Sequence, residues 1–316
     1  GFILWFIISK EEGASGYLKA GVISSLILLP IYIIISYKII NFKFSFSVFK
    51  NLLSFSLPII PTLLSAWVLD LSDRIFIERY FSLAEVGVYS LSYKIAGIVL
   101  IVVTSFGMAY RPLFFKFANM TDIEFGKKEI YKYNYIFLLL FLLLGLSVSL
   151  LSKEIIILLF DVEYIDAYLY IPLIVLAYVF SVAGSLTARF FEQSKKMKSN
   201  MYIYISISII NLALNFILIP VFGAYGAAIS TIISLLIGFV IGYIYSKKHC
   251  YFVPFNWKKL APIIAILILV FVLFNYTIII TNVYYSLILK LIVVSVIGIV
   301  FLAKHFIDYK SILIKN

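Results

Sequence analysis

Long apolar stretches, separated by short polar segments, recur along almost the whole chain. Crossing a hydrocarbon core of ~30 Å takes about 20 helical residues at ~1.5 Å each, and these stretches reach that length. A helix satisfies its own backbone hydrogen bonds, so it is the economical element for spanning a bilayer. The pattern therefore predicts an all-α fold, a polytopic transmembrane helix bundle.

We place nine spans on this pattern, at residues 18–40, 52–77, 86–110, 134–160, 166–188, 201–219, 222–245, 260–281 and 283–303. Segment 52–77 carries three charges and has a low hydropathy for a span. Its assignment as a span therefore depends on whether the loops before and after it lie on opposite sides of the membrane. The loop 111–133 has mixed charge and is expected to be an amphipathic connector. Nothing between the spans is long enough to fold as a soluble domain.

Basic residues are concentrated in alternate loops. In the loops and at the span ends, nineteen Lys and Arg residues fall on one side and four on the other, and the poor side holds eight acidic residues. Loops rich in Lys and Arg face the cytoplasm. The alternation holds only if 52–77 crosses the membrane, and it predicts a cytoplasmic C-terminus.

Composition agrees with a membrane protein, since 64% of the residues are apolar and 13% are charged. The net charge of +11 would suggest nucleic acid in a soluble protein, but the loop asymmetry explains it, so no nucleic-acid partner is expected. The single cysteine, Cys250, excludes an internal disulfide and a multi-cysteine metal site. The sequence lacks a phosphate loop, a metal-ligand cluster and a nucleophile elbow, so we expect no cofactor, no metal and no enzyme.

Segment 52–77 places ionisable residues at the depth of the lipid. Asp70 and Arg74 are four residues apart and share a helix face with Trp67, and Asp73 lies beside that stripe. A charge at the bilayer centre costs at least ~2.5–3.5 kcal/mol, so it needs a partner or water. Either these side chains line an aqueous cavity, or an internal Asp–Arg pair only locks helices together.

Further polar residues lie inside other predicted spans. Lys94, next to Tyr93, either faces the same cavity as a second cation or snorkels to the interface. Asn211 and Asn215 are four residues apart, and the favoured interpretation is that they form hydrogen bonds between helices, with substrate binding as the alternative. Lys290, in the last span, is expected to snorkel.

The span 222–245 carries a stripe of small residues. They recur at every fourth position and so share one helix face: Gly226, Ser230, Ser234, Gly238 and Gly242. Small side chains let a neighbouring helix approach closely. The stripe therefore predicts a packing surface.

Three sequence motifs resemble one transporter family. Leu57-Pro58-Ile59-Ile60-Pro61, followed by Trp67 and Ser72-Asp73-Arg74, resembles the start of the C-terminal lobe of bacterial polysaccharide flippases, and its two prolines predict a bend. Residues 87–95 (GVYSLSYKI) and 211–228 (NLALNFILIPVFGAYGAA) continue the resemblance. Together they resemble the Wzx-type O-antigen and capsule flippases of the multidrug/oligosaccharidyl-lipid/polysaccharide exporter superfamily, over nearly the whole chain.

The resemblance implies a MATE-like fold of two six-helix lobes around a central cavity, with two additional C-terminal helices. By that analogy, residues 1–40 are the end of the N-terminal lobe, with its last one to two transmembrane helices. Residues 41–51 are then the cytoplasmic linker between the lobes, 52–245 the C-terminal lobe, and 246–316 the two additional helices and a cytoplasmic tail. The apolar run Gly1–Ile8 is expected to be the tail of a span that begins upstream.

Members of that family flip undecaprenyl-pyrophosphate-linked oligosaccharide repeat units from the cytoplasmic to the periplasmic leaflet of the bacterial inner membrane. The resemblance thus implies a transporter for surface polysaccharide, such as the O-antigen of lipopolysaccharide, with this polyprenyl-linked oligosaccharide and membrane lipids as partners. It implies substrate binding by Arg74, Lys94, Asp73, Asp70, Tyr93, Asn211 and Asn215. Proton or cation coupling through Asp70 or Asp73 is a further hypothesis.

Three other classes of function stay open, and one of them, a structural membrane scaffold, is disfavoured by paired charges within a span that contains two prolines. A MATE-type drug/cation antiporter of the same superfamily should favour acids over bases in its cavity, and here the bases inside the spans are at least as prominent. A membrane enzyme acting on lipid-linked sugars, a polymerase or glycosyltransferase, would need an extramembrane loop or domain that presents catalytic residues. The loops are too short for that role.

Overall fold

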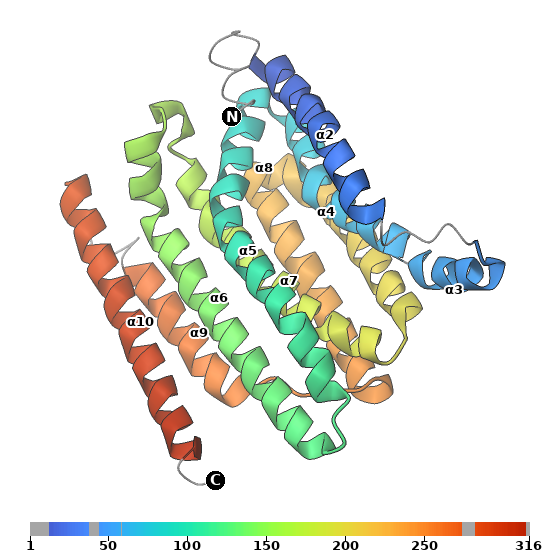
Figure 1. Ribbon diagram of the computed structural model, residues 1–316. Coiled ribbons are helices and arrows are strands. Elements are labelled where there is room, and N and C mark those ends of the chain that lie inside the picture. The colour runs from blue at the N-terminus through green and yellow to red at the C-terminus, as the bar shows by residue number, and fades with distance from the viewer. Residues whose placement is uncertain (1–12, 38–43, 58, 274–281, 314–316) are drawn as a thin grey trace. The chain divides into compact units, whose positions relative to one another are not determined.

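The computed structural model describes residues 13–37, 44–57, 59–273 and 282–313, and every regular element in these ranges is helical (Figure 1). The predicted all-α class is therefore confirmed. The chain divides into two units, Gly1–Ser54 and Phe55–Asn316. In the first unit, α2 (Gly13–Tyr37) is an apolar helix of 25 residues. A short helix, α3 (Phe46–Ser56), crosses the boundary between the units.

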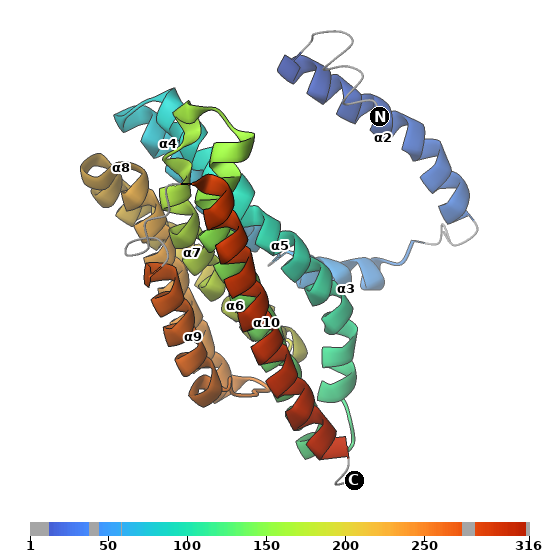
Figure 2. The same ribbon diagram turned by 90° about the vertical axis from the view of Figure 1, so that its left-hand side faces the viewer.

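The second unit is a helix bundle. Its elements are α4 (Ile59–Tyr80), α5 (Leu83–Ala118), α6 (Ile123–Leu159), the short 3₁₀ turn η2 (Val162–Tyr164), α7 (Ala167–Gln193), α8 (Met197–His249), α9 (Trp257–Val272) and α10 (Val283–Leu313). α8 packs against α4 and α7, while α5, α6 and α7 pack against one another. α9 and α10 join the bundle through α6 (Figure 2).

Six helices among the described residues are long and apolar enough to cross a membrane, and they lie in α2, α5, α6, α7, α8 and α10. α8 has 53 residues and contains both of the predicted spans 201–219 and 222–245. α4 is not among the six, because its 22 residues include five charges. The described part of α9 has only 16 residues, fewer than a span needs.

The segment of the predicted span 52–77 is divided between two helices. α3 ends at Ser56 and α4 begins at Ile59. Pro61 lies in the first turn of α4, where its missing N–H removes no helical hydrogen bond. Pro58, the other proline behind the predicted bend, lies outside the described residues.

The predicted connector 111–133 is also helical over most of its length. α5 continues to Ala118 and α6 begins at Ile123, so only residues 119–122 form the turn. Asp122 caps α6, and its Oδ1 accepts a hydrogen bond from the backbone N–H of Phe125 at 3.0 Å. The 36 residues of α5 extend roughly 54 Å, more than the ~30 Å of hydrocarbon, so the helix continues beyond the apolar layer.

One glycine reverses the chain inside α8. Gly223 has φ 57° and ψ −137°, a conformation that residues with a Cβ rarely adopt. The ring of Phe81 lies 3.4 Å from the position that a Cβ on Gly223 would occupy. Pro220, three residues earlier, cannot donate the hydrogen bond that would continue a regular helix. The first and second halves of α8 therefore form an antiparallel pair.

The small-residue stripe is confirmed as a packing surface, and all five of its residues are buried. A Cβ on Gly226 would lie 2.4 Å from the carbonyl oxygen of Leu218, and one on Gly238 would lie 2.1 Å from the side chain of Ile207. Both contacts are with the first half of α8. The stripe thus lets the two halves of α8 approach closely.

Predicted basic loops lie together at one end of the second unit. Gln193 Nε2 donates to Asn119 Oδ1 at 2.9 Å, which joins the α5–α6 turn to the end of α7. Lys196 Nζ donates to the carbonyl oxygen of His249 at 2.5 Å, which joins the α7–α8 turn to the end of α8. This is the arrangement that the predicted alternation of loops requires.

The expectation that Lys290 snorkels is wrong. Lys290 of α10 and Glu154 of α6 are each only 3% exposed, and Lys290 Nζ lies 2.8 Å and 3.0 Å from the two carboxylate oxygens of Glu154. Ser286 Oγ donates to the same carboxylate. The partner is 136 residues away in the sequence, so local spacing could not reveal it. The pair holds α10 on α6, because a buried charge is tolerated only when it is paired.

Replacing Gly226 with alanine is expected to lower the free energy of unfolding by about 1–3 kcal/mol, because the new Cβ would overlap backbone atoms of Leu218. Gly97→Ala is the matched control, since nothing lies within 4 Å of a Cβ there and alanine favours helix. Thermal unfolding of the purified protein in detergent measures both variants. Equal melting temperatures for the two would contradict the close approach within α8.

Replacing Lys290 with methionine is expected to lower the free energy of unfolding by about 3–5 kcal/mol, because it leaves the Glu154 carboxylate buried without a cation. The double variant Glu154→Gln, Lys290→Met removes both charges and should recover most of the loss. Chemical or thermal unfolding in detergent gives the comparison. A single variant as stable as the double variant would show that the pair is not needed to hold α10.

Candidate functional site

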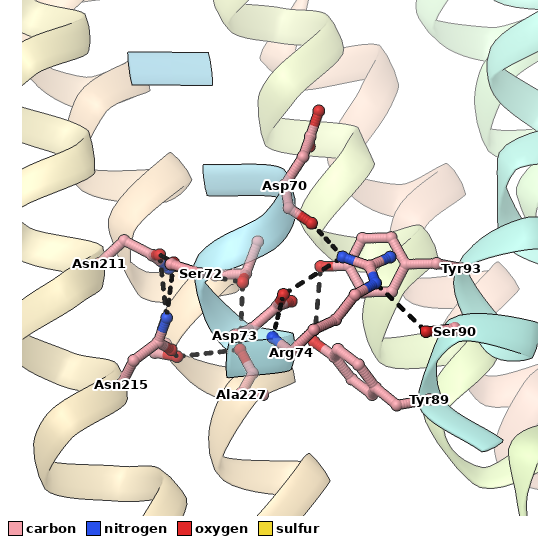
Figure 3. A network of polar contacts seen from close by, with 12 residues as sticks. Asp70, Ser72, Asp73, Arg74, Tyr89, Ser90, Tyr93, Asn211, Asn215 and Ala227 are labelled. Carbon is pink, nitrogen blue, oxygen red and sulfur yellow. Dashed lines mark hydrogen bonds and ion pairs between the residues drawn. The ribbon is translucent and has the colours of Figure 1, made fainter. Parts of the chain in front are cut away.

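The candidate site begins on α4, where three consecutive polar residues follow a run of apolar ones. Ser72 and Asp73 are buried and Arg74 is partly exposed. α4 packs against α8 on one side and α5 on the other. Ser72 contacts α8, and Arg74 contacts α5, so adjacent positions serve two interfaces (Figure 3).

Arg74 is held by several contacts at once. Its Nη1 lies 3.3 Å from Asp73 Oδ1 and also donates to the carbonyl oxygen of Asp70. Its Nε donates to Ser90 Oγ on α5 at 3.2 Å, and its Cζ lies 4.7 Å from the centre of the Tyr93 ring. The guanidinium is thus preorganised by an ion pair, hydrogen bonds and a cation–π contact. Its side chain keeps 22% of its surface exposed.

Asp73 is the buried acid of the site, with no exposed surface. Its Oδ1 accepts from the backbone N–H of Arg74 at 2.8 Å in addition to the guanidinium. Within the described part of the chain its Oδ2 is buried without a hydrogen-bond partner of standard geometry, although the hydroxyls of Tyr89 and Tyr93 interact with the carboxylate. Asp73 therefore has spare capacity to accept a proton or a cation.

Asp70 and Asp73 differ in environment. The predicted pairing of Asp70 with Arg74 is made through the backbone carbonyl of Asp70, while its carboxylate points away from the guanidinium (Figure 3). Asp70 is exposed, whereas Asp73 carries the ion pair. Both interpretations of the pair thus apply in part, because Asp73 and Arg74 lock α4 to α5 and Asp70 faces open space.

Asp70 lines a pocket of about 250 Å³ between α4, α5, α7 and α8. Three tyrosines contribute to its wall, Tyr93, Tyr178 and Tyr204, and Thr231 adds a hydroxyl. The rings of Tyr93 and Tyr178 meet edge to face with centroids 6.2 Å apart. Most other lining residues are apolar or glycine. The pocket is therefore a small, largely apolar cavity with a few polar groups.

Asn211 and Asn215 lie in a buried network between helices, and neither lines this pocket. Asn215 Nδ2 donates to Ser72 Oγ at 3.2 Å and to Asn211 Oδ1 at 3.1 Å, and Ser72 Oγ lies 3.3 Å from Asn211 Oδ1. Ser230, on the second half of α8, donates to Asn215 Oδ1. These contacts correspond to the favoured interpretation of interhelical hydrogen bonding.

Lys94 is exposed and makes no hydrogen bond or ion pair with any residue in the described ranges. Its neighbour Tyr93 lines the pocket and lies under Arg74. Neither Lys94 nor Arg74 is among the residues that line the pocket beside Asp70.

Sequence reasoning missed Tyr178 and the half-buried cation Arg189. The sequence places Arg189 among the basic residues that follow the span 166–188, yet it lies within α7 with its Cζ 4.7 Å from the centre of the Tyr110 ring. Its Nη2 donates to the carbonyl oxygen of Gly107 at 3.4 Å, and its Nη1 is buried without a partner among the described residues. The two phenylalanines that follow Arg189 were a signal that the helix continues into the bundle.

A search of the described residues for groups of three or more His, Cys, Asp or Glu side chains that could hold a metal ion finds none. The polar residues of the site are instead one guanidinium, two carboxylates and several hydroxyls. Such a set can bind charged groups and exchange protons, and no side chain in it is arranged as a nucleophile beside a base.

The MatE family matches residues 58–217, which is just over half of the chain. The match includes α4, α5, α6, α7 and the first half of α8, and so it contains the Asp73–Arg74 pair. No curated protein shows significant sequence similarity to this chain.

A solved structure of the lipid II flippase MurJ, in its inward closed conformation, is similar to this chain with a TM-score of 0.71 and 18% sequence identity. The similarity covers 98% of this chain and 66% of the flippase, so the chain spans about two thirds of the flippase's length. At this identity the likeness establishes the fold. From the family match and this fold, the chain belongs to the MatE family of multi-pass membrane transporters.

Proposed function

We propose that this protein flips a polyprenyl-pyrophosphate-linked oligosaccharide across the membrane, as a Wzx-type transporter for surface polysaccharide. The observation that carries the proposal is Arg74, a preorganised and partly exposed guanidinium in a largely apolar helix bundle. Guanidinium groups bind phosphate oxygens through paired hydrogen bonds, and their charge offsets that of an anion. An anionic headgroup is the part of such a substrate that cannot cross hydrocarbon unaided.

The exposed ammonium of Lys94, on the neighbouring helix, supports an anionic substrate. The lysine ammonium is a point charge on a flexible side chain, so it complements the planar guanidinium of Arg74, whose position is fixed. Asp70, Asp73 and Tyr93 surround Arg74, and the substrate would contact Asp70 and Tyr93 at the pocket wall. Asn211 and Asn215 would act indirectly, by holding α4 on α8.

The proposed cycle is alternating access. Residues 1–40 are the end of an N-terminal lobe, 41–51 a cytoplasmic linker, 52–245 the C-terminal lobe, and 246–316 two additional helices with a cytoplasmic tail. The two lobes rock about the bound headgroup while the lipid tail stays in the bilayer. In this proposal the protein lies in the bacterial inner membrane and moves undecaprenyl-pyrophosphate-linked repeat units from the cytoplasmic to the periplasmic leaflet. The fold shared with a lipid II flippase supports a lipid-linked substrate.

Asp73 is the proposed coupling residue. Its Oδ2 is buried and without a partner of standard geometry, so binding a proton or a small cation there would satisfy it. Protonation would also release Arg74 from its ion pair and free the guanidinium for the substrate. Coupling to an ion gradient would follow, because the binding of a proton or cation by Asp73 and the binding of an anion by Arg74 would each change the affinity of the other.

A MATE-type drug/cation antiporter is the second candidate. The exposed Asp70 carboxylate at a pocket walled by Tyr93, Tyr178 and Tyr204 favours it, because aromatic walls and an acid suit an organic cation. A membrane enzyme is set aside, since the MatE family match identifies a transporter.

Replacing Arg74 with alanine in the native gene is expected to reduce surface polysaccharide at least tenfold with normal protein level, because the headgroup loses its bidentate cation. Arg79→Ala is the matched control, since Arg79 is an exposed arginine in the last turn of the same helix. Polysaccharide is measured on extracted cell surface material, and protein by immunoblot. Wild-type polysaccharide in the Arg74 variant would refute its role, and loss of drug resistance instead would favour the antiporter.

The variant Asp73→Asn is expected to lose the dependence of transport on a proton or cation gradient, because the amide can neither titrate nor attract a cation. Asp70→Asn should keep that dependence, since Asp70 does not carry the ion pair. Transport is followed in vesicles with and without each imposed gradient. Unchanged transport with an unchanged ion response in the variant Asp70→Asn, Asp73→Asn would remove coupling from the proposal.

A further inference from the structure

A second pocket opens at the end of the bundle where the basic loops gather. It lies between the α5–α6 turn, the end of α8 and the segment that follows α8, and it has a volume of about 590 Å³. Its polar wall comes from Lys127, Lys247, Cys250 and Tyr251, and its apolar wall includes Ile123 and Phe252. None of its lining residues lines the pocket beside Asp70.

The two lysines are available to a ligand. Lys247 is exposed and makes no hydrogen bond or ion pair within the described part of the chain. Lys127 lies 3.5 Å from Glu124, but this pair is on the surface and Glu124 is 87% exposed. Exposed pairs of this kind contribute little, so Lys127 can exchange its partner for a phosphate.

Tyr251 and Phe252 fix one wall of the pocket. The Tyr251 hydroxyl has no partner among the described residues, but it is buried and not accessible from the pocket. Its backbone is anchored, since Tyr251 N donates to Ser194 Oγ at 2.7 Å. The next residue, Phe252, packs edge to face on Tyr243 and Phe190, with centroids 5.1 Å and 5.5 Å apart. The wall of the pocket is thus part of the hydrophobic core.

We propose that this pocket binds the headgroup of an acidic phospholipid. Two ammonium groups suit a phosphodiester, and basic pockets between membrane helices are where such headgroups bind. The apolar wall of Ile123 and Phe252 adds contact that a lipid uses and a free anion does not. The site therefore takes a lipid of the surrounding leaflet. It is independent of the transported substrate, because it contains neither Arg74 nor Lys94.

Cys250, the single cysteine of the chain, lines this pocket and serves as a reporter. The full chain is placed in nanodiscs of phosphatidylcholine, with or without phosphatidylglycerol, and the rate at which N-ethylmaleimide modifies Cys250 is measured. Burial raises the pKa of the Cys250 thiol, so the reaction is followed at mildly alkaline pH. We expect phosphatidylglycerol to slow the modification at least fivefold.

The matched pair of variants is K127Q/K247Q and K128Q/K248Q, which remove equal charge from adjacent exposed or half-exposed positions, inside and outside the pocket. Each lysine removed is expected to weaken lipid binding about fivefold. The first double variant should therefore raise the phosphatidylglycerol content that halves the rate of Cys250 modification roughly tenfold to thirtyfold, and the second should leave it unchanged.

Equal loss of protection in the two double variants would overturn the proposal, because it would mean that the positively charged surface as a whole, and not this pocket, attracts the anionic lipid. Protection by inorganic phosphate in phosphatidylcholine nanodiscs, at the level that phosphatidylglycerol gives, would also overturn it in favour of a free anion. Native mass spectrometry provides the second readout, and we expect it to show phosphatidylglycerol retained by the wild type and by K128Q/K248Q only. Neither readout involves transport, so failure here is distinct from failure of the proposed flippase function.

Discussion

A charge or amide inside an apolar bundle must find a partner, and this requirement organises the second unit of the chain. Asp73 pairs with Arg74, Glu154 with Lys290, and Asn215 with Ser72 and Asn211. The second pair joins α6 to α10 and the amide network joins α4 to α8, while Arg74, paired with Asp73 on α4, reaches α5 through Ser90. Polar groups that would be costly alone therefore specify which helices lie together.

α4 is where this requirement produces a site. Ser72 forms a hydrogen bond with α8 and Arg74 forms one with α5, so the two contacts fix the rotation of α4 about its axis. Fixing that rotation places Asp70 at the pocket and buries Asp73. The guanidinium is held by groups from two helices and keeps part of its surface exposed, which is what a preorganised anion site needs.

Close packing of α8 supports the same site from the other side. Gly223 reverses the chain, and the small residues that follow let the second half of α8 lie against the first. Thr231 on the second half then lines the pocket, while Ser230 bonds Asn215. The motif that contributed most to the family resemblance is thus the segment that builds the turn and the polar network.

The sequence by itself determined the helical class, most of the membrane-crossing segments, the small-residue packing surface and the presence of charges at membrane depth. Those features depend on composition and on spacings of three or four residues, which a helix converts directly into faces. Only the tertiary structure decided that Asp73 and not the Asp70 carboxylate pairs with Arg74, that Arg189 lies inside the bundle, and that Lys290 is buried on Glu154. These outcomes depend on which helices become neighbours and how each is rotated, and residues far apart in the chain settle that, such as Ser72 with Asn211 and Glu154 with Lys290.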